Sequence, residues 1–458
     1  MRFAGLSLTA FVLIASATLA CSSSPSADPP ATDAGVEASS EPPVVTPEED
    51  AGQPDVRRPN VEPAPRLAVE CAQDPCYVAV SGNGGEHVCG LLKDGTVRCW
   101  GRDTRARAAV PSDGGAAETD GALGRGHAVS AIEGATPAPV VGLAGVKQVS
   151  VGRNLGTCAL TEDGAVYCWG RNEFGQLGRP PTEARVPVPA RIEGLPPAAA
   201  VALGSTIGCA VAAADGALWC WGARAHKLSG LLGPSEEATF APQVMPAFKA
   251  PVRELVIGSS RATSDPYFGP LPDYDTITAL LEGGVLATFG DLPAGASSVT
   301  SPTAPTEVHG VVRIGTFGYL EQSGILSRWV PNQRALYIPN AAAVVDVAIT
   351  AATDYGPVPP TKYVEQAGVL LATGRLYRWG RNISGALGYA TDVVDIADEP
   401  LDMTHVAGDR VVSFAMTAAS TCVSLVNGTV KCWGSNQRGE LGRGTVDPAQ
   451  HPEAELIR

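Results

Sequence analysis

The sequence is poor in aromatic and charged residues, and it carries no excess of positive charge. Aromatic residues make up 6% and charged residues 17% of the 458 positions, whereas hydrophobic residues make up 45%. A chain this apolar can bury a substantial core, which excludes wholesale disorder. The formal net charge of −14 disfavours a nucleic-acid partner, because a surface that binds nucleic acid must neutralise phosphates.

Sequence patterns of catalysis and metal binding are lacking as well. The chain contains no His-Glu-x-x-His run, no Gly-x-Ser-x-Gly elbow, no phosphate-binding loop and no complete calcium loop. Asp273 and Asp275 have the spacing of calcium ligands, but Tyr274 separates them and the downstream glutamate is missing. We expect a protein that is not an enzyme and that needs neither a cofactor nor a metal ion. The six histidines are scattered along the chain: His87, His127, His226, His309, His405 and His451.

Glycine and proline, by contrast, are abundant, with 52 and 38 residues. Both destabilise helix interiors, so a long helical bundle is disfavoured. The length allows either three domains of ordinary size or one large all-β domain. The 11 cysteines are an odd number, which requires a separate role for one of them.

The first 21 residues have the pattern of an exported protein. A positive charge at Arg2 and an apolar stretch over residues 3–20 are typical of a secretory signal peptide. The sequence Thr18-Leu19-Ala20-Cys21 resembles the lipobox of bacterial lipoproteins, although its leucine lies two positions before the cysteine instead of three. The resemblance implies removal of residues 1–20, lipidation of Cys21 and, because Ser22 is not an aspartate, an outer-membrane lipoprotein that is periplasmic or surface-exposed. An ordinary signal peptide cut nearby is the alternative.

We expect residues 21–66 to form a disordered tether between the lipid anchor and a folded domain. Positions 22–66 contain ten prolines, nine acidic residues and three arginines, a composition that cannot bury enough apolar surface to fold. A proline-rich segment with net negative charge repels itself and extends. No later segment approaches the length of a membrane-spanning helix.

A repeated motif fills the rest of the chain. The segment Cys422 to Gly434 has close copies at Cys89 to Gly101, Cys158 to Gly170 and Cys209 to Gly222, and three degenerate copies. The aromatic residue of each copy marks seven units, at Trp100, Trp169, Trp221, Phe289, Trp329, Trp379 and Trp433. A second motif, Gly-x-Leu-Gly, follows in five of the units, beginning at Gly121, Gly175, Gly230, Gly385 and Gly439.

Each unit has the pattern of four short strands. Asp-Gly or Asn-Gly between alternating apolar residues predicts a hairpin, an apolar strand such as 146–152 precedes it, and a fourth strand follows. Four short strands in a unit of roughly fifty residues are typical of a β-propeller blade. The sequence therefore predicts an all-β fold, a seven-bladed β-propeller over residues 67–458. Residues 64–70 are candidates for an outer strand that closes the ring beside residues 451–458.

The units resemble the regulator of chromosome condensation repeat. Its pattern is His-Thr-Cys-Ala-Leu, then Asp-Gly, Cys-Trp-Gly and Asn-x-x-Gly-Gln-Leu-Gly, and the second unit matches nearly throughout, ending with Asn172 to Gly178. The resemblance covers residues 77–458 and is strong in units 1, 2, 3, 6 and 7. It implies the same ring of seven blades, and it implies that His87, at the repeat histidine, is a structural residue.

Hairpin register predicts cross-strand disulfides. With Gly95 in the left-handed conformation of a three-residue turn, Cys89 falls opposite Cys99 at a non-hydrogen-bonded position, within disulfide range. Export favours the oxidised state; buried free thiols are the alternative, and no histidine cluster suggests zinc. At the equivalent positions, units 4, 5 and 6 have neither cysteine. Joint absence is expected if the two cysteines of a unit are bonded to each other. The expected pairs are Cys89–Cys99, Cys158–Cys168, Cys209–Cys220, Cys422–Cys432 and a local pair Cys71–Cys76.

Insertions point to one face of the ring as a binding surface. Units 4 and 6 carry insertions between their first two strands, and units 1 and 3 carry them after the third strand. By parity all four lie on the same face, whereas the hairpin turns on the other face stay short. Aromatic residues on exposed loops are common interface anchors. The candidate partner-binding residues are Tyr267, Phe268, Asp273, Tyr274, Asp354 and Tyr355; the alternative is that the aromatic side chains pack only their own loops.

These features favour a monomeric, envelope-anchored, non-enzymatic scaffold that binds an unidentified protein or another envelope ligand. The resembled family includes an intracellular exchange factor, whose activity does not fit an exported chain, and a secreted inhibitor of β-lactamases. An enzyme inhibitor is therefore one alternative. A hydrolase that acts on polysaccharide or peptide at the insertion-loop face, and a purely structural surface protein, are the others.

Overall fold

The structure is a computed structural model in which the chain divides into two units, residues 1–57 and 58–458. The residues whose structure is described all belong to the second unit, so the predicted signal peptide, Cys21 and nearly all of the predicted tether lie outside them. They are 64–104, 119–222, 240–245, 250–260, 274–290, 308–316, 318–328, 336–338, 343–352, 364–382, 384–390 and 395–457.

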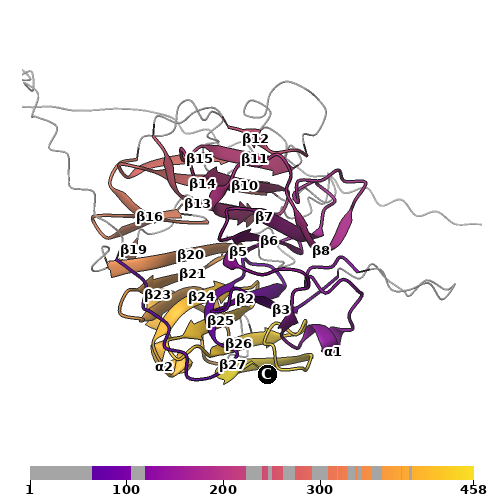
Figure 1. Cartoon of the computed structure of the whole chain (residues 1–458). Helices are drawn as coiled ribbons and strands as arrows, with labels where there is room; N and C mark the ends of the chain where they lie inside the picture. The colour runs from indigo at the N-terminus through magenta and orange to yellow at the C-terminus, as the bar shows by residue number, and fades with distance from the viewer. Residues whose placement is uncertain are drawn as a thin grey trace, which may run out of the picture. The chain divides into compact units, whose positions relative to one another are not determined.

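Seven antiparallel sheets follow one another along the chain and form the seven blades of a β-propeller (Figure 1). Blade 1 consists of β1 (Tyr77–Ser81), β2 (His87–Leu92), β3 (Val97–Gly101) and β4 (Ala138–Pro139). Blade 2 consists of β5 (Val146–Val151), β6 (Gly156–Thr161), β7 (Val166–Arg171) and β8 (Arg185–Arg191). Blade 3 consists of β9 (Ala198–Leu203), β10 (Ile207–Ala212), β11 (Leu218–Gly222) and β12 (Gln243–Val244).

The remaining blades follow the same order, except that three described strands make up the sheet of blade 4. Blade 4 consists of β13 (Val252–Ser260), β14 (Tyr274–Leu281) and β15 (Val285–Gly290). Blade 5 consists of β16 (Val311–Gly315), β17 (Gly318–Glu321), β18 (Ile325–Arg328) and β19 (Leu336–Tyr337). Blade 6 consists of β20 (Val344–Ala352), β21 (Val364–Leu371), β22 (Leu376–Asn382) and β23 (Asp395–Asp402). Blade 7 consists of β24 (Val411–Met416), β25 (Ser420–Leu425), β26 (Val430–Asn436) and β27 (Asp447–Leu456).

The described part of the chain contains two short helices, α1 (Ala131–Gly134) and α2 (Thr404–Ala407). The architecture confirms the predicted all-β, seven-bladed ring. No described helix is long and apolar enough to cross a membrane.

Turn chemistry explains why the repeat folds into hairpins. Gly164 has a φ of +84°, a left-handed conformation that favours glycine. The carboxylate of Asp163 accepts hydrogen bonds from the Thr161 hydroxyl (2.6 Å) and the Ala165 amide (3.3 Å) and so fixes the turn. Gly170, which follows the tryptophan, must also lack a side chain, because a Cβ there would lie 2.2 Å from the Leu155 carbonyl oxygen.

The hydrophobic core is divided into seven clusters, and each cluster fills the seam between two consecutive blades. The cluster between blades 2 and 3, for example, joins Leu160 and Leu177 of blade 2 to Trp221 of blade 3. The seam between blades 7 and 1 has the same construction, with Leu441 packed in one cluster with Trp100. Blades that cannot bury their faces alone are thus stabilised by their neighbours.

The ring closes without exchange of a strand, and the prediction that residues 64–70 form an outer strand of blade 7 is wrong. All four strands of blade 7 come from residues 411–456. Residues 64–70 have no strand structure. Instead, the amides of Glu70 and Ala72 donate to the carbonyl oxygens of Val426 (2.7 Å) and Asn427 (3.1 Å) in the hairpin turn of blade 7.

The five cysteine pairs are bonded in the structure. In the four blade pairs the Cα atoms lie 4.1 to 4.2 Å apart, and in Cys71–Cys76 they lie 5.6 Å apart. The short separation in the blades is that of non-hydrogen-bonded partners. The three blades without the bond keep the register, with Thr278 opposite Thr288, Gly318 opposite Arg328 and Gly368 opposite Arg378.

Candidate functional site

The two ends of the blades differ, and the difference defines a candidate binding face. We call the end with the turns between second and third strands the turn face, and the opposite end the insertion face. In blade 2 the pairing of the first two strands ends at Val151 opposite Thr157. The equivalent pair of blade 4 is Ile257–Ile277, and three further pairs follow, up to Ser260–Tyr274.

Blade 6 repeats this extension. Its pairing continues past Ile349–Ala367 by three pairs, up to Ala352–Val364. At about 3.3 Å per residue, the hairpins of blades 4 and 6 extend roughly 10 Å beyond the level of blade 2. In blade 5 the pairing stops one pair short of that level, at Gly315–Gly318. Two long hairpins therefore flank one short hairpin on the insertion face.

Five of the six predicted partner-binding residues lie in parts of the chain that the structure does not describe. They are Tyr267, Phe268, Asp273, Asp354 and Tyr355. Tyr274 begins β14 and pairs through its backbone with Ser260, and nothing is described of its side chain. An interface formed by these residues stays a prediction.

Asp275 is a buried carboxylate at the base of the blade 4 hairpin. It accepts hydrogen bonds from the amides of Ser205 (2.9 Å), Thr206 (2.6 Å) and Ile207 (3.1 Å), and from the hydroxyls of Thr206 and Ser259. Burial raises the pKa of Asp275, and these hydrogen bonds oppose the rise. Because five donors of the protein surround its oxygens, Asp275 joins blade 4 to blade 3 and is not available as a calcium ligand.

Polar side chains cross the ring near its axis on the insertion face. The Asn83 amide of blade 1 donates to the carbonyl oxygen of Ile257 in blade 4 (3.0 Å). Arg153 of blade 2 reaches the same strand and donates to the carbonyl oxygen of Ser259 (2.7 Å). These contacts tie distant blades together across the axis.

A charged cluster lies at the turn-face end of the axis. Arg313 of blade 5 lies 3.2 Å from Glu254 of blade 4, and Arg253 lies 3.7 Å from the same carboxylate oxygen. Burial raises the pKa of Glu254, against the effect of both arginines. Nearby, Arg66 from the N-terminal segment pairs with Asp346 of blade 6 (2.7 Å). Sequence reasoning missed this cluster, because nothing in the repeat marks charged residues on first strands.

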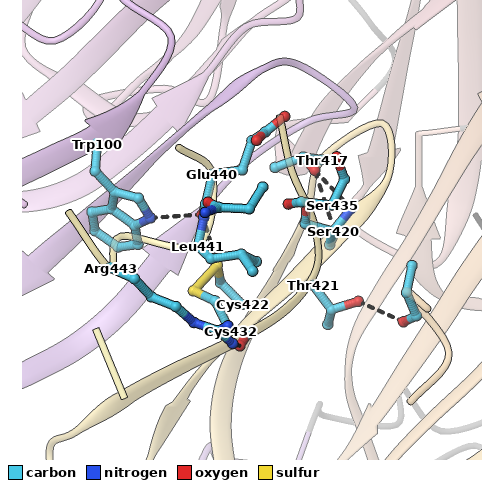
Figure 2. The surroundings of a disulfide bond; sticks show 12 residues. Trp100, Thr417, Ser420, Thr421, Cys422, Cys432, Ser435, Glu440, Leu441 and Arg443 are labelled. Carbon is cyan, nitrogen blue, oxygen red and sulfur yellow. Dashed lines mark hydrogen bonds between the residues drawn. A yellow bond between two sulfur atoms is a disulfide. The ribbon is translucent and has the colours of Figure 1, made fainter. Parts of the chain in front are cut away.

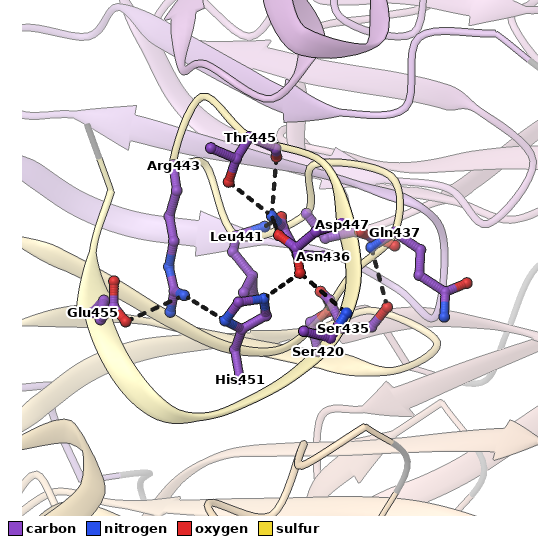
Figure 3. A network of polar contacts seen from close by, with 12 residues as sticks. Ser420, Ser435, Asn436, Gln437, Leu441, Arg443, Thr445, Asp447, His451 and Glu455 are labelled. Carbon is purple, nitrogen blue, oxygen red and sulfur yellow. Dashed lines mark hydrogen bonds and ion pairs between the residues drawn. The ribbon is translucent and has the colours of Figure 1, made fainter.

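Two of the described histidines, His451 and His87, make side-chain contacts within the ring. In Figure 3, His451 lies between Arg443, which lies 3.1 Å from its Nδ1, and Asp447, which lies 2.7 Å from its Nε2. Both ring nitrogens are therefore engaged, and neither is free to act as a base. His87 is fully buried, its Nε2 contacts the Thr157 hydroxyl at 2.8 Å, and burial lowers the pKa of His87 to about 4.

Glu440 occupies the seam between the last and first blades. Figure 2 shows its carbonyl oxygen accepting a hydrogen bond from Trp100 Nε1, at 2.9 Å. Its side-chain carboxylate accepts from the Arg438 amide (2.8 Å). Burial raises the pKa of Glu440 to about 7, and the neighbouring Glu86 contributes to the rise. Among the described residues no cluster of three or more metal-ligating side chains is present.

Comparison with known proteins agrees with this architecture. The sequence matches the family described as regulator of chromosome condensation (RCC1) repeat over residues 163–211, and a second description of the same repeat over residues 77–106 and 146–176. The chain therefore carries RCC1 repeats at these residues, within a seven-bladed β-propeller.

Relatives of known sequence are much longer than the matched region. The E3 ubiquitin-protein ligase HERC2 of Mus musculus is 26% identical over 313 residues, which make up 67% of this chain and 5% of the ligase. The protein pim1 of Schizosaccharomyces pombe is 37% identical over 116 residues, which make up 25% of this chain and 20% of pim1. The chain thus spans only a small part of the curated relatives that it matches.

Solved structures share the fold. The crystal structure of Prp20p from Saccharomyces cerevisiae superposes with a TM-score of 0.58 at 18% identity, covering 85% of this chain and 90% of Prp20p. The structure of yeast RCC1 (Prp20) bound to Kap60 gives 0.56 at 16% identity, covering 85% and 87%.

Proposed function

We propose that this protein is an envelope-anchored, non-enzymatic propeller that binds a protein partner on its insertion face. The observation that carries the proposal is the register of blades 4 and 6, whose hairpins run three residue pairs past the level of blade 2. The predicted anchors Tyr267, Phe268 and Tyr355 belong to the connections of these two hairpins. A rigid ring that displays long aromatic connections is a common arrangement for binding.

The attachment of the N-terminal segment supports the choice of face. Ala64 packs against the core between blades 6 and 7, and Arg66 pairs with Asp346 at the turn-face end of β20. The described part of the segment, which starts at Ala64, therefore contacts the ring at the turn face. With a lipid on Cys21, this attachment leaves the insertion face free for a partner.

The described residues also favour binding over catalysis. The buried carboxylates Asp275 and Glu440 and the half-buried carboxylate Glu254 each have hydrogen-bond or ion-pair partners within the ring. Both solved structures of similar fold are of one yeast propeller, Prp20p, and they are described in terms of binding: to Gsp1p and histones in one, and to Kap60 in the other. Their partners are not carried over to this chain.

Site-specific photo-crosslinking in intact cells tests the face. A photoreactive residue at position 267 or 355 is expected to give a protein adduct, whereas one at Glu162 or Asp215, both exposed on the turn face, is expected to give none. Equal adducts from both faces, or adducts from the turn face only, would contradict the proposal. The double variant Tyr267→Ala/Tyr355→Ala should lose the partner that the crosslink identifies, and unchanged capture of that partner would exclude these two anchors.

The anchor is tested separately. Cys21→Ser is expected to abolish labelling by a radioactive fatty acid and to move the protein from the membrane fraction to the soluble fraction. Labelling that persists in Cys21→Ser would contradict lipidation at this residue and leave the choice of face untouched.

A further inference from the structure

We propose that blade 5 opens as a local unit while the rest of the ring stays closed. Among the described residues, blade 5 has the shortest strands of the four-stranded sheets: they have 5, 4, 4 and 2 residues, against 6, 6, 6 and 7 in blade 2. It also lacks the cross-strand disulfide, since Gly318 lies opposite Arg328 where blade 2 has a bonded cysteine pair.

On one side, blade 5 packs against blade 4. The described part of the apolar cluster at this seam consists of Leu280 and Leu286 of blade 4 and Val311 and Ile314 of blade 5.

The other side of blade 5 lacks a hydrogen bond that four other seams possess. In those seams a tryptophan Nε1 donates to the carbonyl oxygen of the second residue of Gly-x-Leu-Gly in the preceding blade. The donors and acceptors are Trp100 and Glu440, Trp169 and Ala122, Trp221 and Gln176, and Trp433 and Ala386, at 2.9 to 3.1 Å.

Trp379 of blade 6 has no such acceptor. The sequence from 329 to 343, which follows the third strand of blade 5, contains no glycine and hence no Gly-x-Leu-Gly. The Nε1 of Trp379 is buried without a hydrogen-bond partner. A buried donor without a partner destabilises the packed state relative to one that water can reach, so this seam favours opening.

The ring can stay closed when blade 5 opens, because β13 of blade 4 and β20 of blade 6 also contact each other directly. Polar contacts also link blade 5 to its neighbours. Arg313 pairs with Glu254, Arg253 donates to the Val312 carbonyl oxygen (3.2 Å), and the Thr316 hydroxyl donates to the Ile349 carbonyl oxygen. Water can satisfy all of these groups after opening. The opened state would expose the apolar faces of Leu280, Leu286 and Trp379 between the two long hairpins.

Hydrogen exchange of the full chain, measured by mass spectrometry, tests the proposal. Amides of β16, β17 and β18 are expected to exchange at least tenfold faster than the register-matched amides of β5, β6 and β7, and with weak dependence on added urea, as for local opening. Equal protection in blades 2 and 5, or an equally steep urea dependence in both, would show that blade 5 opens only when the whole ring unfolds. This inference rests on contacts within the ring and does not depend on the proposed partner surface.

A variant pair sharpens the test. Arg313→Met removes the ion pair between blade 5 and Glu254 of blade 4. It is expected to accelerate exchange in β16 to β18 by a further tenfold and to leave exchange in blade 2 unchanged. Arg443→Met, a similarly buried arginine of blade 7, is expected to leave blade 5 at its wild-type rate. If Arg313→Met accelerates exchange in every blade alike, the local unit does not exist. The wild-type comparison decides the matter even if a variant fails to fold.

Discussion

Trp100 Nε1 donates to the carbonyl oxygen of Glu440 at 2.9 Å, and this bond joins the first blade to the last. The same relationship recurs between Trp169 and Ala122, one blade further on. Beside each bond, the leucine of Gly-x-Leu-Gly packs in the core of the seam, as Leu441 and Leu123 do. The seam between blades 7 and 1, which closes the ring, therefore has the same construction as the seam between blades 1 and 2.

The first prediction concerns these tryptophans. Trp433→Phe removes one of three donors to the buried carbonyl of Ala386, and those from Arg378 and Thr421 remain. We therefore expect a loss of about 0.5–1.5 kcal/mol in the free energy of unfolding, the net value of one hydrogen bond. Trp379→Phe removes the same atoms, but its Nε1 has no partner to lose, so its effect should be smaller. Urea denaturation of both variants measures the difference. Equal losses would mean that the lost ring volume, and not the hydrogen bond, determines the effect.

The second prediction is a new disulfide in blade 4. Thr278 and Thr288 face each other in the register of the cysteine pairs, and both hydroxyls are buried without partners. The double variant Thr278→Cys/Thr288→Cys is expected to form the bond under oxidising conditions and to gain about 2–3 kcal/mol, as estimated for a loop of this length. Thiol counting under denaturing conditions and thermal melting check it. Thr278→Cys alone is the control, and two free thiols in the double variant after oxidation would contradict the register argument.

The third prediction is a pH dependence that comes from Glu440. Burial raises its pKa in the folded protein to about 7 from 4.5, so the folded state holds this proton more tightly than the unfolded state. The stability that protonation contributes is complete below pH 4.5 and is lost as the pH rises through 7, by up to about 3 kcal/mol. Glu440→Gln, which copies Gln176 of blade 2, should remove that loss. Parallel stability–pH curves for the two proteins would contradict the assignment.

The fourth prediction is a pH dependence of stability with the opposite sign, and it comes from His87. The pKa of His87 falls in the folded protein to about 4 from 6.5, so the unfolded state takes up the proton first. Stability is lost as the pH falls from 6.5 towards 4. His87→Gln, which introduces the residue type that Gln366 provides at the equivalent position of blade 6, should be less sensitive to acid than the wild type. Thermal melts of both proteins, followed by circular dichroism between pH 4 and 7, measure this difference. If the variant loses stability in acid as steeply as the wild type, His87 is not the source of the loss.

The sequence was sufficient for the fold because its signals are local. The turn glycine of a hairpin fixes which residues face each other, so Cys158 opposite Cys168 follows from counting outward from Gly164, and the structure has this register. The same counting places the Thr278–Thr288 pair. The absence of Gly-x-Leu-Gly from blade 5 can likewise be recognised from the sequence.

Contacts between blades could not be derived in this way. Four of the five donors to Asp275 come from residues about 70 positions earlier in the chain, and no local pattern marks them. The expectation for residues 64–70 failed for a related reason. Their apolar and extended character fits a strand, but the amide of Glu70 donates to a carbonyl oxygen of the blade 7 turn, which the sequence does not identify as an acceptor.

The blades of the described ring follow one another in chain order, but the ring itself does not distinguish a first blade from the others. The amide of Tyr77 donates to the carbonyl oxygen of Gly428 (2.8 Å), and the amide of Ile457 donates to that of Val430 (3.1 Å), so both ends of the propeller lie beside one turn. Because no strand is exchanged across that seam, a short connection like residues 192–197 could bridge the two ends. New termini could then be placed between any other two blades, and a circularly permuted chain would keep all seven seams.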